Sequence, residues 1–138
     1  MADPTPAVRA VTYERDQHRC VSCGATSNFE YQHRDALGMG GSKIRPVLEE
    51  GLTSCVFCNP AYEHTLQMVA LKYGWKVRGW VKDRHGSVGV VPVYYLPERT
   101  WYRLTREGTR VRVSRAEAMR MMHDVYGVQY DEERGLVA

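Results

Sequence analysis

The sequence lacks the features that mark a membrane-spanning, fibrous or disordered chain. No apolar run approaches the roughly 18 to 20 residues that a transmembrane helix needs. The first six residues, Met1 to Pro6, contain no apolar core of a signal peptide. Only 12 of the 138 residues are glycine and 6 are proline, 43% are hydrophobic, and no repeat or low-complexity segment occurs, which excludes collagen, coiled coil and wholesale disorder. We therefore expect a folded, soluble, intracellular protein with no membrane partner.

Cysteine is scarce, and its placement is the strongest signal in the chain. The four cysteines form two C-x-x-C pairs, Cys20-Val21-Ser22-Cys23 and Cys55-Val56-Phe57-Cys58, with 31 residues between them. A C-x-x-C turn directs two thiolates at one point, so two turns supply the four sulfurs of a closed, structural Zn²⁺ site. The alternatives are two disulfides, which an intracellular setting disfavours, and a redox C-x-x-C, which needs one motif in a βαβ unit.

The net charge is only mildly positive, with 19 Lys and Arg against 16 Asp and Glu. Four thiolates and one Zn²⁺ lower the formal +3 to about +1. The distribution of charge is more informative, because positions 99 to 120 hold seven arginines and two glutamates, a local +5. These are Arg99, Arg103, Arg106, Arg110, Arg112, Arg115 and Arg120, with Glu107 and Glu117. The stripe is a candidate DNA-backbone surface or a solvated arginine-rich face.

Local patterns predict the elements of the first 81 residues. Thr5-Pro6 begins a helix that reaches about Gln17, and the alternation of residues 28–33 is typical of a strand. A glycine-rich loop, 37–42, leads to a return strand at 44–48. A helix of about four turns is expected to grow directly from Cys58 and to end at Gly74, and residues 75–81 are expected to form a further strand.

The remaining residues, 82–138, change in character and are expected to form an appended segment. Short strands are predicted at 88–96, 101–104 and 110–113. Ser114-Arg115-Ala116-Glu117 is a capping box that begins a helix, and Gly127 ends it.

Several motifs together resemble the HNH endonuclease superfamily over about residues 8 to 80, most closely the small HNH proteins of actinobacterial phages. The residues that carry the resemblance are Arg15-Asp16 ahead of the first cysteine pair, His33-Arg34, Gly38-Met39-Gly40-Gly41-Ser42, Leu52, Cys55-Val56-Phe57-Cys58-Asn59, Glu63 and Gly74-Trp75. The resemblance implies an α+β fold: a zinc-stabilised treble-clef ββα-metal core in residues 1–81, with a small antiparallel β-segment and a C-terminal helix appended in 82–138.

The resemblance also implies a metal-dependent endonuclease that acts on DNA. His33 corresponds to the general base that activates water, and Asn59 to a ligand of a catalytic Mg²⁺ or Mn²⁺. Gln32 and Glu63 are the further candidate ligands, and Glu50 stands where the family has an asparagine that helps orient the base. The candidate DNA-contacting residues are Arg34, Lys43, Arg110 and Arg112.

The setting implied is the cytoplasm of a bacterial or phage-infected cell, with phage packaging or replication proteins as further partners. The alternative function is a non-catalytic zinc treble-clef module that binds DNA or a protein partner, because Gln32 and Glu50 depart from the family motif. A third is a phage accessory protein whose C-terminal half is the functional surface.

Overall fold

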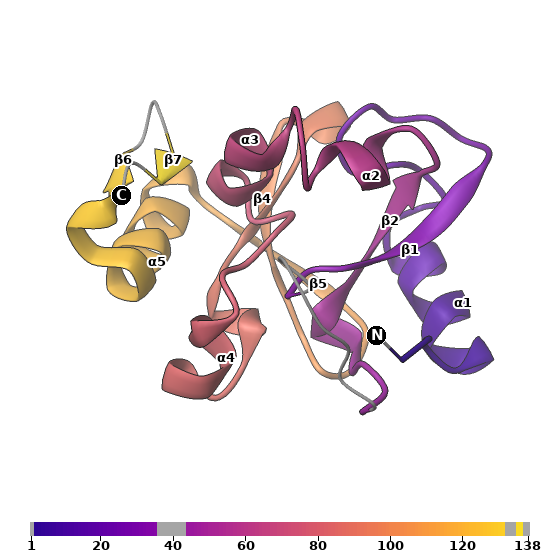
Figure 1. Ribbon diagram of the computed structural model, residues 1–138, viewed down its shortest axis with the longest axis horizontal. Helices are drawn as coiled ribbons and strands as arrows, with labels where there is room; N and C mark the ends of the chain where they lie inside the picture. The colour runs from indigo at the N-terminus through magenta and orange to yellow at the C-terminus, as the bar shows by residue number, and fades with distance from the viewer. Residues whose placement is uncertain (1, 36–43, 132–134, 137–138) are drawn as a thin grey trace.

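The computed structural model describes residues 2–35, 44–131 and 135–136 of the chain. The glycine-rich loop 37–42 and the candidate DNA contact Lys43 lie outside the described residues. Helices and small antiparallel sheets alternate along the chain (Figure 1). In order, the elements are α1 (Pro6–Arg15), β1 (Phe29–His33), η1 (Leu48–Glu50), β2 (Gly51–Cys55), α2 (Cys58–Ala61), α3 (Gln67–Lys72), α4 (Trp80–His85), η2 (Val88–Val90), β3 (Val93–Tyr95), η3 (Leu96–Glu98), β4 (Thr100–Leu104), β5 (Arg110–Val113), α5 (Arg115–Tyr126), η4 (Gly127–Gln129), β6 (Tyr130–Asp131) and β7 (Gly135–Leu136).

The antiparallel hairpin β1–β2 brings the two cysteine pairs together. Phe29 pairs with Cys55 at one end of the hairpin, and His33 pairs with Gly51 at the other. The helices with strong cap signals are confirmed: the Thr5 side chain accepts a hydrogen bond from the Val8 N–H at the start of α1, and Ser114 caps α5 through the Glu117 N–H. A second sheet has the strand order β3-β4-β5.

Four expected elements differ in the structure. The strand predicted at 88–96 is a strand only at Val93–Tyr95, which lies between the 3₁₀ turns Val88–Val90 and Leu96–Glu98. The return strand predicted at 44–48 is wrong, because β2 begins at Gly51 and Leu48–Glu50 is a 3₁₀ turn. The single helix from Cys58 is wrong: the Leu66 N–H donates to the Ala61 carbonyl five residues earlier, and this wide turn separates α2 from α3. The strand predicted at 75–81 is also wrong, since α4 starts at Trp80.

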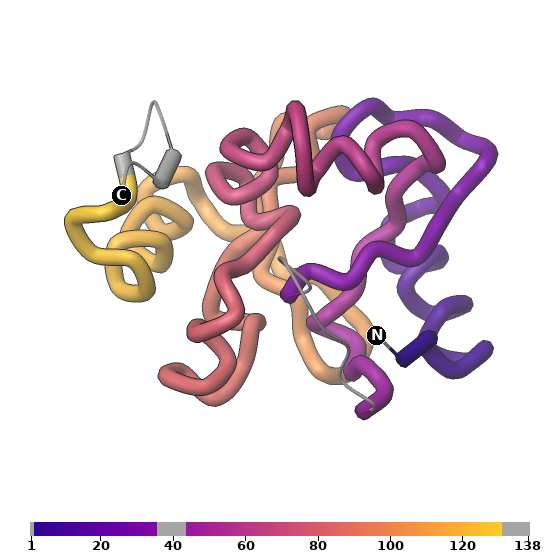
Figure 2. Tube along the Cα trace, in the orientation of Figure 1, coloured from indigo at the N-terminus to yellow at the C-terminus, as the bar shows by residue number. Residues whose placement is uncertain are grey.

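The apolar core consists of two clusters, and each contains residues from both halves of the sequence. In one, Leu71 and Val81 pack with residues of β4 and α5, among them Trp101 and Met122. In the other, Trp75 and residues of the β1–β2 region pack with Val93 and Tyr95 of β3. Figure 2 shows how the chain makes this possible, because the segment containing β3, β4 and β5 runs between the N-terminal elements and α5. Residues 1–81 and 82–138 therefore bury their apolar side chains against each other.

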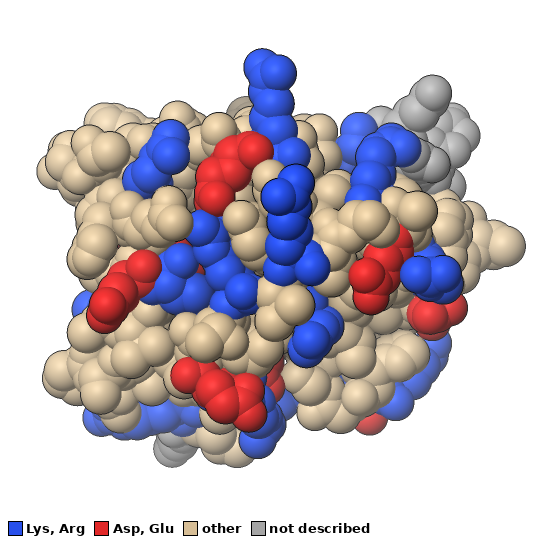
Figure 3. Space-filling view, turned by 180° about the vertical axis from the view of Figure 1, so that it is seen from behind, with Lys and Arg blue, Asp and Glu red and all other residues tan. Residues whose placement is uncertain are grey.

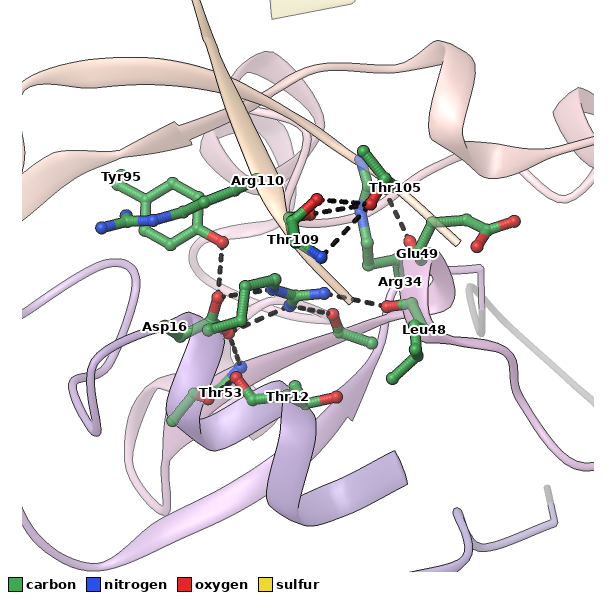
Figure 4. A network of polar contacts seen from close by, with 12 residues as sticks. Thr12, Asp16, Arg34, Leu48, Glu49, Thr53, Tyr95, Thr105, Thr109 and Arg110 are labelled. Carbon is green, nitrogen blue, oxygen red and sulfur yellow. Dashed lines mark hydrogen bonds and ion pairs between the residues drawn. The ribbon is translucent and has the colours of Figure 1, made fainter. Parts of the chain in front are cut away.

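The ion pair of Arg15 and Asp16 joins α1 to both sheets. The Arg15 guanidinium donates to both carboxylate oxygens of Asp16, at 2.9 and 3.1 Å, and to the Gly51 carbonyl at 2.7 Å. The same carboxylate accepts hydrogen bonds from the Thr53 N–H at 2.8 Å and from the Tyr95 hydroxyl at 2.5 Å (Figure 4). Both charged side chains are buried, and the network holds the end of α1 against β2 and β3.

Arg34, expected to contact DNA, is instead completely buried. Its guanidinium donates five hydrogen bonds of 2.8 to 3.4 Å to backbone carbonyls, two of them to Gly74 and the others to Glu49, Val88 and Val91. Burial, followed by the charge of Arg15, lowers the pKa of Arg34 to about 10, so the group stays charged at neutral pH. The DNA-binding prediction is wrong for this residue because no part of its side chain reaches solvent.

Replacing Arg34 is expected to destabilise the whole fold. Arg34→Met retains an apolar chain but removes all five guanidinium hydrogen bonds to four buried carbonyls, so the free energy of unfolding should fall by about 3 to 5 kcal/mol in urea titrations. Arg103→Met is the matched control, because Arg103 is exposed on β4 and should change stability by less than about 0.5 kcal/mol. Equal stability of the two variants would contradict the role given to Arg34.

Candidate metal centre and catalytic pocket

The four cysteines form one cluster that could hold a metal ion. Their sulfur atoms all lie within 4.8 Å of one another, and the Sγ atoms of Cys23 and Cys55 are 3.7 Å apart. Four sulfurs at about 2.3 Å from a tetrahedral zinc ion would be separated by about 3.8 Å, so the cluster is compatible with structural zinc. Cys20 and Cys23 come from the turn before β1, Cys55 ends β2, and Cys58 begins α2.

The electrostatics of this cluster favour a bound cation. Burial raises the pKa of Cys20, but hydrogen bonds from Ser22 and from nearby backbone N–H groups outweigh it and lower the pKa to about 6. Burial raises the pKa of Cys58, and the neighbouring cysteines raise it further. Four thiolates cannot be charged together at this separation without a positive partner, and a divalent ion supplies that charge.

Three hydroxyl groups form a chain of hydrogen bonds that reaches the sulfur of Cys20, and the sequence did not predict them. The Tyr62 hydroxyl lies 2.6 Å from Ser22 Oγ and 2.9 Å from Ser54 Oγ, and Ser22 Oγ is 3.4 Å from the Cys20 sulfur. Hydrogen bonds of this kind orient metal ligands. The only sequence signal is the position of each serine beside or between cysteines and of Tyr62 four residues after Cys58.

A shallow pocket of about 350 Å³ brings together three of the predicted catalytic residues. His33 reaches it from the end of β1, and Asn59 and Glu63 reach it from the segment that follows Cys58. Two further polar residues line the same pocket: the Glu30 carboxylate accepts a hydrogen bond from the Asn59 amide at 3.1 Å, and Lys76 Nζ lies 3.6 Å from the Glu63 carboxylate. The sequence analysis missed Glu30 and Lys76, which have no motif around them.

His33 is held by the start of the chain. Its Nε2 atom is 2.9 Å from the carbonyl oxygen of Ala2, and its ring lies edge-on to Tyr31 at 5.0 Å between centroids. Because a carbonyl only accepts hydrogen bonds, Nε2 is the donor in this contact, and in a neutral ring the lone pair is on Nδ1. The Lys76 ammonium also donates to the His33 backbone carbonyl at 2.8 Å, which fixes the end of β1.

Two predicted site residues do not join His33. Gln32 is completely buried and donates to the Trp75 carbonyl at 2.6 Å, because neighbouring residues of a strand point to opposite faces. Glu50 is buried too; its carboxylate pairs with Lys82 at 2.5 Å and accepts from the Val47 N–H at 2.8 Å. Across the described part of the chain, the four cysteines are the only group of three or more metal-ligating His, Cys, Asp or Glu side chains within reach of one ion.

Two of the arginines between 99 and 120 are paired with glutamates outside that range. Arg110 forms an ion pair with Glu98, and its guanidinium lies 4.2 Å from the Tyr102 ring and 4.7 Å from the Tyr95 ring. Arg106 pairs with Glu49 at 2.9 Å. The local +5 therefore overstates the free charge, and Arg110 serves as a packed side chain between two tyrosines.

Several basic side chains are nevertheless exposed on the face of the molecule drawn in Figure 3, where acidic side chains lie among them. Arg112 of β5 is exposed and remains a candidate DNA contact.

Comparisons with protein-family models, with curated proteins and with solved structures find no match for this chain. The treble-clef and HNH assignments therefore stay predictions. Within the described ranges, no helix has the length and apolar character needed to cross a bilayer.

Removing the metal from the cysteine cluster is expected to unfold the protein. The free energy with which a structural metal binds its cysteines is part of the folding free energy. A strong chelator should therefore abolish the cooperative thermal transition seen by circular dichroism, and added Zn²⁺ should restore it. Added Mg²⁺ is the control and should not restore it, because thiolates are poor ligands for this ion. A retained transition with four thiols open to a thiol reagent would contradict the metal site.

Proposed function

We propose that this protein is a zinc-stabilised endonuclease of the HNH type that hydrolyses phosphodiester bonds of DNA. The observation that carries the proposal is the pocket that joins His33 on the hairpin to Asn59 and Glu63 beyond the last cysteine. These residues are 26 and 30 positions apart in sequence, and the cysteine cluster holds the strand and helix that present them. A hairpin, a helix and a four-cysteine cluster arranged in this way also support a treble-clef ββα-metal core.

In this proposal His33 acts as the general base. Its imidazole takes a proton from water, the resulting hydroxide attacks phosphorus, and the bond from phosphorus to the 3′ oxygen breaks. The products are a 5′-phosphate and, once the leaving oxygen is protonated, a 3′-hydroxyl. While Nε2 donates to the Ala2 carbonyl, the lone pair of a neutral ring is on Nδ1. If the Ala2 carbonyl moved away, Nε2 could instead accept a proton from water.

Asn59 and Glu63 are the residues that would hold the catalytic divalent ion. Amide and carboxylate oxygens suit Mg²⁺ or Mn²⁺, whereas Gln32 faces away from the pocket and is no longer a candidate. When bound, the ion would neutralise negative charge on the scissile phosphate and on the leaving oxygen. The ammonium of Lys76 lies on the same side and adds positive charge near Glu63.

A non-catalytic zinc module is the second candidate function. One specific observation favours it. The two residues that depart from the family motif make contacts outside the pocket: Gln32 donates to the Trp75 carbonyl, and Glu50 pairs with Lys82. A module of this kind would bind DNA or a protein partner without cutting it.

A nicking assay separates the two functions. With zinc-loaded protein, supercoiled plasmid and added Mg²⁺ or Mn²⁺, we expect the wild type to produce open-circular DNA. His33→Ala should slow nicking by about 10² to 10⁴, the usual contribution of a general base.

His64→Ala is the matched control, because His64 is exposed one residue after Glu63 and should leave the nicking rate unchanged. If wild type and His33→Ala nick at the same rate, His33 is not the general base and the catalytic proposal is wrong. If neither nicks while both bind DNA, the non-catalytic module is the correct function.

A further inference from the structure

A second cavity, of about 580 Å³, shares no residue with the pocket at His33. It lies where the end of α3, the β3-β4-β5 sheet and the start of α5 meet. The residues that line it are Lys72, Tyr73, Tyr94, Arg99, Thr100, Trp101, Arg112, Val113, Ser114, Arg115, Met119 and Tyr130. Of the site residues predicted from the sequence, Arg112 alone is among the described residues that line it.

Three aromatic rings form a continuous wall of this cavity. The ring of Tyr94 is stacked on Tyr73 with 4.9 Å between centroids and lies 5.1 Å from the Trp101 ring. Trp101 is nearly buried, whereas Tyr73 and Tyr94 are half-buried and keep part of their surface open. Within the described residues the Tyr94 hydroxyl makes no hydrogen bond, so this residue contributes its ring rather than its polar group.

Among the described residues, the charged groups of the lining are all positive. They are Lys72, Arg99, Arg112 and Arg115, which belong to α3, β4, β5 and α5 or lie next to these elements. Arg99 and Arg112 are exposed, and no carboxylate in the described ranges pairs with either. The N-terminus of the 12-residue helix α5, capped by Ser114, adds the positive end of its dipole.

We propose that this cavity binds nucleotides of single-stranded DNA, with a base stacked against Tyr94 and the flanking phosphates at Arg99 and Arg112. Ring faces together with cations that follow a backbone are the means by which proteins hold single strands. A duplex does not fit this wall, since its bases are stacked on one another and present only their edges. Arg99 and Arg112 come from separate strands or the residues next to them, and two exposed guanidinium groups exceed what one phosphate group requires, which favours a strand over a free nucleotide.

The inference rests on the proposed function for the choice of DNA, and it names the form of that DNA: a strand with unpaired nucleotides. It does not depend on His33, because the two cavities have different residues. The test can therefore use His33→Ala protein, in which the proposed mechanism slows cutting of the ligand by about 10² to 10⁴.

The first measurement is fluorescence anisotropy with a labelled oligothymidine of about ten nucleotides. Tyr94→Leu should weaken binding at least about fivefold, since one base stack is lost, whereas Tyr94→Phe keeps the ring and should bind like the parent. A thermal melt of each variant shows whether the fold is intact. Competition with unlabelled duplex of the same sequence and with thymidine 5′-monophosphate should be weaker than competition with the unlabelled strand.

The second measurement varies salt. Arg99→Gln with Arg112→Gln should lower the slope of log Kd against log salt concentration by about 1.4, the value expected for two phosphate contacts on a single strand. Arg103→Gln with Arg120→Gln is the control: it makes the same change in net charge at two exposed arginines that do not line the cavity, and the slope should stay unchanged.

Equal effects of the two arginine pairs, duplex competition as strong as that of the strand, mononucleotide competition as strong as that of the strand, or parent-like binding by Tyr94→Leu would each overturn the inference. These outcomes are distinct from failure of the proposed function. A protein that binds the strand but never nicks plasmid loses the catalytic proposal alone, and one that nicks through His33 but does not bind the strand loses this inference alone.

Discussion

The buried guanidinium of Arg34 is the contact on which the rest of the molecule depends. It lies directly after β1 and donates to backbone carbonyls within η1, after α3, at the start of η2 and directly after η2. A lysine has three donors on one atom and cannot span these positions, whereas the planar guanidinium offers five donors in fixed directions. Arg34 follows His33, so the contact that holds the segments together also fixes where the candidate base emerges from the strand.

The hairpin β1–β2 is fixed at both ends by polar or metal contacts instead of by apolar burial alone. At the Phe29–Cys55 end the cysteine cluster joins the hairpin to the turn before it and to α2. At the His33–Gly51 end Arg34 and the Arg15–Asp16 pair supply the restraint. These polar anchors act in addition to the apolar clusters that this region shares with residues 82–138. The pocket lined by His33, Asn59 and Glu63 lies between these two anchors.

Features encoded by neighbouring residues were predicted from the sequence, and features that depend on distant contacts were not. The C-x-x-C pairs and the caps at Thr5 and Ser114 are local, and they were found in the places expected. The break between α2 and α3 was missed because the Tyr62 hydroxyl forms hydrogen bonds with Ser22 and Ser54. These contacts are made with residues outside the helix, so the sequence of residues 58–74 does not indicate them. Arg34 was misassigned for the same reason, since the sequence His-Arg is the same whether the arginine contacts DNA or is buried against backbone carbonyls.

The arginines illustrate why net charge is a poor guide to binding in this protein. Arg15, Arg34 and Arg110 are taken up by interior contacts, and Arg106 is paired with Glu49 from 57 positions away. The cations that remain beside the aromatic wall of the larger cavity are few, and screening by salt weakens exposed charges further. Recognition at that surface must therefore draw on ring stacking as much as on charge, and stacking is insensitive to salt and to sequence. In the proposed complex, such a surface would distinguish the unpaired form of DNA more sharply than it would distinguish one sequence from another.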